Sequence, residues 1–201
     1  SSGETNIYAG FQIRHNRKLE SNGYTYFYKS RWLRYMVDAP SEGFEGMWRT
    51  HFSPTKSFIH YAQVKWRHSQ RNIPNLGTPD FGTEQTHQYN WRWEGQYTPM
   101  AGWRFNTRAE LSQYATESDH YANGFYLHQD IGYKSTNGKW AVYARYGVFS
   151  TDDYNSRIYV YEPDVRYAFS VPALSGQGTR TVMVFRWSPL RQWDIYARWS
   201  N

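Results

Sequence analysis

The stretch Trp103-Arg104-Phe105-Asn106-Thr107-Arg108-Ala109-Glu110-Leu111-Ser112 decides the fold. Its odd-numbered positions carry apolar or small side chains, whereas its even-numbered positions carry charged or polar ones. Successive side chains of a β-strand point to opposite faces, so this alternation predicts a strand with one apolar and one strongly polar face. A helix would scatter the same charges around its whole circumference.

The same division recurs along most of the chain. Alternating segments cover residues 6–14, 44–52, 62–67, 89–97, 125–133, 140–148, 183–187 and 193–200. The segment Tyr24–Val37 is also extended but mixes its faces near Arg31. We therefore predict an all-β fold of roughly 10–12 strands, each of about 9–12 residues, which is the length that a tilted strand needs to cross a bilayer. Strands in soluble sheets average only about five or six residues.

The composition disfavours a soluble protein with an aliphatic core. Aromatic residues make up 20% of the chain, with 19 Tyr and 10 Trp, and the mean hydropathy is −0.87. Tyr and Trp suit places that are apolar at one end and wet at the other, such as membrane interfaces. The absence of cysteine excludes disulfides and a thiol nucleophile. The net charge of +6 is spread over alternate positions, so nucleic-acid binding is not expected.

These patterns together predict that residues 1–201 form a single domain, an antiparallel transmembrane β-barrel of a bacterial outer membrane. An arginine that faced lipid at the midplane would cost about 2–4 kcal/mol, so the polar positions should line the lumen. The predicted lumen-lining residues are Arg92, Glu94, Arg104, Arg108, Glu110, Asp130, Arg145, Arg186, Asp194 and Arg198. The expected partners are outer-membrane lipid, lipopolysaccharide and other outer-membrane or periplasmic subunits. No cofactor or metal site is predicted.

The connections between the segments differ in length. Tight turns are expected at 53–56, 98–101, 135–138 and 188–192, and long polar loops at 68–86 and 115–123. Short turns that alternate with long loops are typical of outer-membrane barrels, in which the short turns are periplasmic. Counting strands from these turns places both ends of the chain on the outer side. This parity predicts a fragment of a larger barrel, with one strand missing before residue 5 and one after residue 201.

Residues 150–179 interrupt the regular pattern. They can form one large external loop that contains a short hairpin, Arg157–Glu162 and Val165–Val171, around Pro163-Asp164. The same hairpin could fold inward as a plug, or its two arms could be further membrane strands. The length of each arm, about six residues, favours the loop or the plug.

Three stretches in this part of the chain carry a family resemblance. They are residues 123–130 (NGFYLHQD), 149–159 (FSTDDYNSRIY) and 161–180 (YEPDVRYAFSVPALSGQGTR). Over roughly residues 120–200 the sequence resembles the C-terminal half of uncharacterised Bacteroidota outer-membrane proteins that carry an N-terminal helix-hairpin-helix segment. The resemblance implies a barrel that continues with another strand pair. It implies no established activity, and the nucleic-acid role suggested by the helix-hairpin-helix segment does not transfer.

No catalytic constellation stands out from the sequence. His68 and Ser69 are adjacent, but consecutive strand residues point to opposite faces. Asp152-Asp153 and Asp119-His120 could form a calcium site or remain solvated loop residues. The inward arginines could pair with carboxylates in a narrow or plugged barrel, or form a constriction that selects anions. We therefore expect a channel or transport component, or a subunit of an outer-membrane complex. The alternatives are an outer-membrane hydrolase and a soluble β-barrel or sandwich binding protein.

Overall fold

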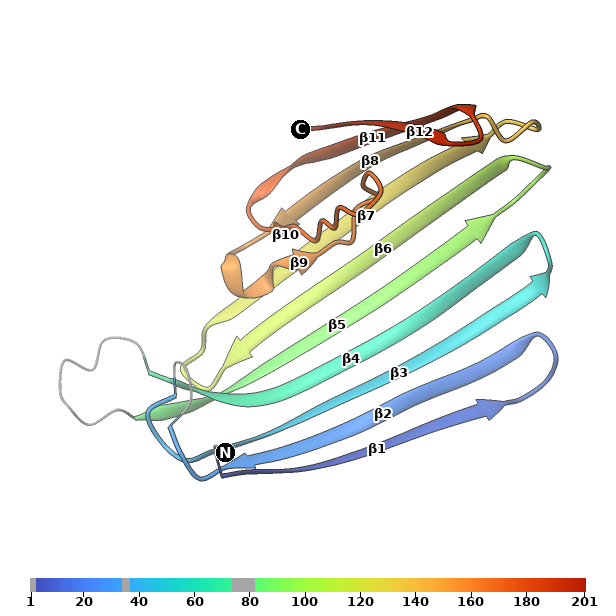
Figure 1. The fold of residues 1–201 in the computed structure, drawn as a ribbon. Helices are drawn as coiled ribbons and strands as arrows, with labels where there is room; N and C mark the ends of the chain where they lie inside the picture. Colours follow the sequence, from blue (N-terminus) through green and yellow to red (C-terminus); the bar gives the residue numbers. More distant parts are fainter. Residues whose placement is uncertain (1–2, 34–36, 74–81) are drawn as a thin grey trace.

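The computed structural model describes residues 3–33, 37–73 and 82–201. Residues 34–36 of the predicted segment Tyr24–Val37 and residues 74–81 of the predicted loop 68–86 lie outside this range. Ten strands form one antiparallel sheet in which each strand pairs with its neighbours along the chain, except that β8 pairs directly with β11 (Figure 1). The strands are β1 (Glu4–Arg14), β2 (Leu19–Ser30), β3 (Ser41–Thr55), β4 (Phe58–Asn72), β5 (Thr83–Tyr97), β6 (Trp103–Thr116), β7 (Tyr121–Lys134), β8 (Trp140–Thr151), β11 (Gln177–Leu190) and β12 (Trp193–Ser200). The prediction of an all-β, antiparallel fold is confirmed.

The sheet is open. β1 and β12 lie at its two edges, and no pairing joins them among the described residues (Figure 1). The described strands therefore form a long twisted meander that does not close into a barrel, and the prediction that they are part of a larger barrel remains a prediction. None of the described residues forms a helix that is long and apolar enough to cross a membrane.

Short connections gather at one end of the sheet and longer ones at the other end, as the turn residues predicted (Figure 1). Several predicted boundaries need correction. β2 begins and ends earlier than the predicted segment Tyr24–Val37, and residues 68–72 and 83–86 of the predicted loop 68–86 belong to β4 and β5. The connection at 115–123 is a tight turn and not a long loop, because the Thr116 N–H donates to the His120 carbonyl at 3.0 Å. Residues Ser53–Thr55 and Ser188–Leu190 continue β3 and β11, with irregular pairing in each case, so the reversals come later than predicted.

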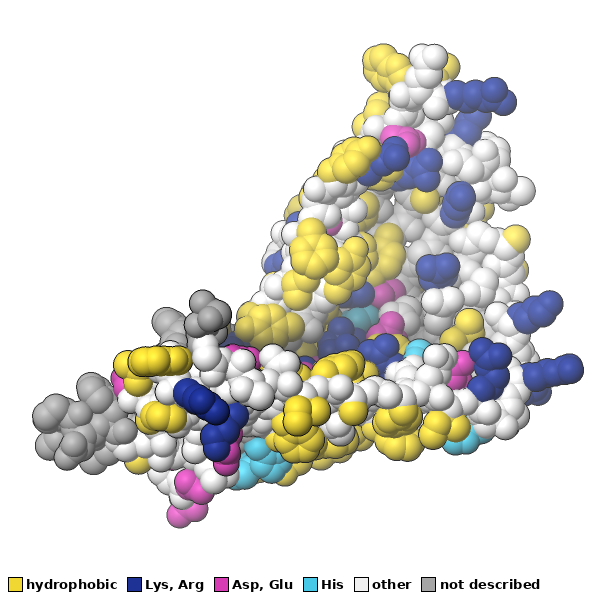
Figure 2. Space-filling view, turned by 60° about the horizontal axis from the view of Figure 1, so that its bottom comes forward, with side chains coloured by type: hydrophobic (Ala, Val, Ile, Leu, Met, Phe, Trp, Pro, Cys, Tyr) yellow, Lys and Arg dark blue, Asp and Glu magenta, His cyan; other side chains and the backbone are white. Residues whose placement is uncertain are grey.

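The sheet has an apolar face and a polar face, and their exposure is the reverse of that in a soluble protein. On the apolar face, Leu127 is 39% and Met183 49% exposed, whereas His128 and Asp130 on the polar face are only 2% and 4% exposed. In β7 every second residue from Ala122 to Asp130 is buried, and these are the polar-face positions. Figure 2 shows charged side chains in the angle of the bent sheet and hydrophobic rings along its lower surface.

A segment between β8 and β11 covers part of the polar face. This docked segment, residues Tyr154–Leu174, contains a single 3-10 turn, η1 (Tyr154–Ser156), and two short strands, β9 (Ile158–Tyr159) and β10 (Ala173–Leu174). β9 pairs with β10, and Glu162 bridges to Ser170. The predicted pairing of 157–162 with 165–171 is therefore wrong in register, and these residues do not supply two further strands of the main sheet. The reason is that the apolar side chains of Ile158, Val160 and Leu174 bury against Tyr126 of β7.

Candidate functional site

All ten residues predicted to line a lumen lie on the polar face. The strand registers show this directly, because Arg92 is opposite Glu110, Glu94 is opposite Arg108, and Asp130 is opposite Arg145. Side chains opposite each other on neighbouring antiparallel strands share a face. Alternation along each strand places Arg104, Arg186, Asp194 and Arg198 on the same face. Their position facing an aqueous lumen remains a prediction.

The first charged cluster centres on Glu110 of β6. Arg92 Nε donates to Glu110 Oε2 at 2.8 Å, and Arg108 donates to the same carboxylate. Glu110 and Arg108 are 3% and 6% exposed. One buried carboxylate thus joins two arginines on neighbouring strands, which satisfies charges that would be costly to bury alone.

The second cluster centres on Asp130 of β7. Arg145 forms a bidentate pair with Asp130, at 2.7 and 2.9 Å, and His128 Nε2 lies 3.3 Å from the same carboxylate. The Asn106 amide donates to Asp130 at 3.3 Å and to Glu94 at 3.1 Å. Because Asn106 bridges two carboxylates, it links four neighbouring strands, β5 to β8, through one polar network.

The third cluster centres on Glu162, which the sequence did not identify. Its side chain is fully buried and accepts hydrogen bonds from Arg180 at 2.6 and 2.8 Å and from Arg198 at 2.7 Å. Glu162 therefore fastens the docked segment to β11 and β12. The signal in the sequence was weak, because Glu162 lies outside the regular strands.

Two further contacts hold the docked segment by its backbone. Arg108 Nη2 donates to the Tyr159 carbonyl at 3.1 Å, and Arg145 Nη1 donates to the Tyr161 carbonyl at 2.7 Å. Gly124 of β7 allows the close approach, since a Cβ at this position would lie 2.3 Å from the Ser156 carbonyl oxygen. The arginines therefore serve the sheet and the docked segment together.

The other predicted residues are less enclosed. Arg186 pairs with Asp194 at 3.2 Å near the β12 edge, where both side chains are partly exposed. Arg104 has no ion-pair partner within the described ranges. The structure does not bring these three residues into the buried clusters.

Sequence reasoning missed two acidic centres on β3 and β5. Glu45 accepts from Lys65 at 2.9 Å and from Tyr24 at 2.6 Å, and it also pairs with Arg67. Glu84 pairs with Arg71 at 2.8 Å. Glu45 occupies a polar position of the alternation and could have been found by that signal, but Glu84 and Arg71 lie in a stretch that was predicted to be a loop.

The loop residues proposed as a calcium site come together only in part. His120 Nε2 lies 2.6 Å from Asp153 Oδ2, while Asp152 Oδ2 accepts a hydrogen bond from the backbone N–H of Asn123 at 2.8 Å. Burial opposes the shift, but hydrogen bonds from Asn155 and His120 lower the pKa of Asp153 below its ordinary value. Among the residues that the structure describes, no group of three or more His, Asp or Glu side chains is placed to hold a metal ion.

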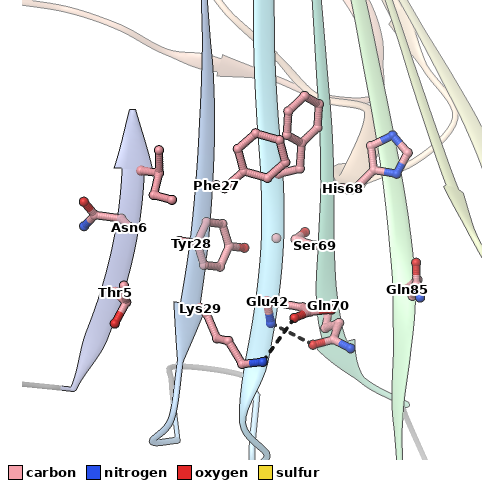
Figure 3. Close-up of a pocket in the computed structure, with 13 residues that line it drawn as sticks. Thr5, Asn6, Phe27, Tyr28, Lys29, Glu42, His68, Ser69, Gln70 and Gln85 are labelled. Atoms are coloured by element: carbon pink, nitrogen blue, oxygen red, sulfur yellow. Dashed lines mark hydrogen bonds and ion pairs between the residues drawn. The ribbon is translucent and has the colours of Figure 1, made fainter. Parts of the chain in front are cut away.

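A hollow on the apolar face lies where its hydrophobic side chains are replaced by polar and charged ones (Figure 3). Ile7, Phe27 and Phe44 lie at one end, and polar residues such as Lys29 and Gln85 lie toward the strand ends. The side chain of His68 lies on this face, where its Nδ1 is 2.8 Å from His87 Nδ1. The side chain of Ser69 lies on the polar face and forms a hydrogen bond with the hydroxyl of Thr86. The prediction that His68 and Ser69 point to opposite faces is confirmed.

The site therefore consists of fixed, mostly paired charges and of hydrogen-bonding groups on one face of the sheet, partly roofed by the docked segment. Cationic and hydrogen-bonding groups arranged in this way can bind anions. The chain matches no known protein-family model, and no curated protein matches it either.

Proposed function

We propose that this chain is an integral component of a bacterial outer-membrane β-barrel, with its apolar face against lipid and its polar face toward an aqueous lumen. One observation carries the proposal: all nine tryptophans within the strands lie on the apolar face. Tryptophan concentrates at the interfaces of membrane barrels, where its ring is buried and its N–H stays near water.

The apolar side chains form a band in register across the sheet. Tyr97 is opposite Phe105, Phe105 opposite Ile131, and the same row continues through Ala144 and Met183. The band covers about nine residues in each central strand, which matches the 9–11 residues of a tilted membrane-spanning strand. In the hollow of Figure 3 the hydrophobic band ends, and the charged residues Lys29 and Glu42 follow it. Charged side chains at this position are expected in the headgroup region of a membrane.

The open edges support an assembly that is larger than the described sheet. Unpaired backbone groups cost several kcal/mol each in hydrocarbon, so β1 and β12 require further strands beside them. These strands can come from the same polypeptide, from a second copy or from another subunit. Strands from a second copy or from another subunit would make this chain a structural subunit of an outer-membrane complex, which is the second candidate function.

The docked segment favours a transport component with a restricted path. It lies on the polar face and is held there by Glu162, Arg108 and Arg145. A segment that narrows the lumen is typical of plugged outer-membrane barrels. The resemblance of residues 120–200 to the Bacteroidota outer-membrane proteins belongs to the same proposal.

Spin labels test the orientation of the sheet. The chain contains no cysteine, so Ala109→Cys and Asn106→Cys each introduce a single thiol, on the apolar and polar faces of β6 respectively. In reconstituted vesicles, we expect the label at 109 to collide with dissolved oxygen in the lipid and the label at 106 to collide with a water-soluble nickel complex. Equal accessibility at both positions, or a detergent-free soluble monomer, would contradict the proposal.

Conductance separates the two candidate functions. A transport component should give discrete conductance steps in planar bilayers, and these should increase when the docked segment is released by Glu162→Ala. A structural subunit should give none in either form but should co-purify with fixed partners after gentle solubilisation of the native membrane.

A further inference from the structure

A second hollow, on the polar face, lies between the sheet and the start of the docked segment. It has a volume of about 480 Å³, within the usual range of small-molecule sites. β4, β5 and β6 form its floor, and Asn155, Arg157 and Tyr159 form one wall. We propose that this basic pocket binds a small organic anion that carries two or more carboxylates, an inference that rests on the proposed function and specifies its solute.

The charges that surround the pocket favour an anion. Five cationic side chains line it: Lys65, Arg67, Arg71, Arg92 and Arg157. Three carboxylates neutralise part of this charge, since Glu45 pairs with Lys65 and Arg67, Glu84 with Arg71, and Glu110 with Arg92. The cations that line the pocket therefore outnumber the carboxylates beside them, which favours an anion with more than one negative charge. A concave, partly roofed surface of one sign raises the local concentration of the opposite charge.

Arg157 is the cation that is most available to a ligand. It has no carboxylate partner within the described part of the chain, and its Nε and Nη1 atoms donate to the Tyr159 hydroxyl at 2.8 Å and to the Tyr154 carbonyl at 2.7 Å. These contacts, together with stacking over the Tyr154 ring at 4.2 Å, hold the guanidinium in place and leave Nη2 without a described partner. A preoriented guanidinium is well suited to a carboxylate.

Neutral donors complete the pocket. The side chains of Gln88 and Asn90 line it from β5 and make no hydrogen bond to any described residue. Amide groups of this kind hydrogen-bond to carboxylate or hydroxyl oxygens. The combination favours an organic acid over a bare inorganic ion, because the donors are spread over three strands and the docked segment.

Binding of citrate to the whole chain in detergent micelles, measured by calorimetry at low salt, tests the inference. We expect saturable binding with one site per chain, weakened about tenfold by Arg157→Gln, which removes one charge-assisted contact. Gln88→Leu should weaken it as well, and this change lies on the sheet and not in the docked segment. Arg191→Gln, in the exposed turn between β11 and β12, is the matched control and should leave the affinity unchanged.

Three outcomes would overturn the inference: no saturable binding, equal affinity of the Arg157 and Arg191 variants, or inorganic phosphate binding as tightly as citrate. Spin-label accessibility at positions 106 and 109, measured in reconstituted vesicles as described above, separates the two proposals. If the membrane pattern is present and citrate does not bind, the anion site fails and the membrane orientation stands. If the membrane pattern is absent, the proposed function fails whatever citrate does.

Discussion

The polar face differs sharply between β1–β2 and β6–β8. At the β1–β2 edge, Arg14 and Glu20 lie 3.6 Å apart with side chains 75% and 30% exposed. In β7 and β8, Arg145 and Asp130 lie 2.7 Å apart and both side chains are 6% exposed. Both pairs come from the same alternation of apolar and polar residues. Covering by the docked segment accounts for the difference, because it lies over β6–β8 and leaves β1 fully exposed.

Over β6–β8, therefore, pairing within the sheet neutralises the charges and the docked segment contributes to their burial. Surface ion pairs contribute little to stability, whereas breaking a buried pair is costly because it leaves an uncompensated charge. Substitutions over β6–β8 should therefore have large effects, and equivalent substitutions near β1 should have small ones.

Glu162→Ala is expected to have the largest effect. It leaves Arg180 and Arg198 without their shared carboxylate, which should lower the stability of the docked segment by about 3–5 kcal/mol. Trypsin cleavage at Arg157 and Arg166 should accelerate strongly, since cleavage follows the population of the open form. Glu20→Ala is the matched control, and a similar acceleration in that variant would remove the contrast between the two regions.

Arg145→Lys should have the next largest effect. Lysine keeps the charge but cannot form the bidentate pair with Asp130 and also reach the Tyr161 carbonyl. We expect a loss of about 2 kcal/mol in the free energy of unfolding. This is measured by following the urea-dependent equilibrium between the unfolded chain and the chain folded in lipid vesicles. Arg14→Lys at the exposed edge should change this free energy by less than about 0.5 kcal/mol. Equal losses would show that burial does not distinguish the pairs.

Gly124→Ala tests the close approach of the docked segment to β7. The added methyl group would meet the Ser156 carbonyl, so the segment must shift, at a cost of about 1–2 kcal/mol. Faster amide exchange in residues 154–160 would report the shift. Gly132→Ala on the same strand is the control, since its Cβ would make only ordinary contacts, the nearest at 3.7 Å. Unchanged exchange in Gly124→Ala would mean that the segment is not closely packed there.

The smallest expected effect concerns pH. The pKa of Asp153 is lowered in the folded chain, so its contribution is present above the ordinary aspartate pKa of about 3.9 and is lost as the pH falls through the lower folded value. Because the pair with His120 is partly exposed, this contribution should be below about 1 kcal/mol. Asp153→Asn should be less stable than the wild type at pH 6, and the difference should shrink toward pH 3. A difference that is constant across this range would contradict the assignment.

Much of the candidate site was predictable from local pattern. Alternation alone placed Arg108, Glu110 and Asp130 on one face, because side-chain direction in a strand has a period of two residues. Turn residues predicted most reversals. The turn at 117–120 was missed because it lacks Gly and Pro, although Ser118 and Asp119 are turn-forming residues and Asp119 adopts the left-handed region with a φ of 60°.

The sequence by itself determined most of the strands and which residues of each strand lie on the apolar face and which on the polar face, since these depend on neighbours one or two residues apart. Only the tertiary structure decided that Arg92 meets Glu110, that Glu162 joins Arg180 and Arg198, and that the described sheet stays open. These features depend on register between strands and on a segment that returns across the sheet. Contacts between residues far apart in the chain leave no periodic trace in the sequence.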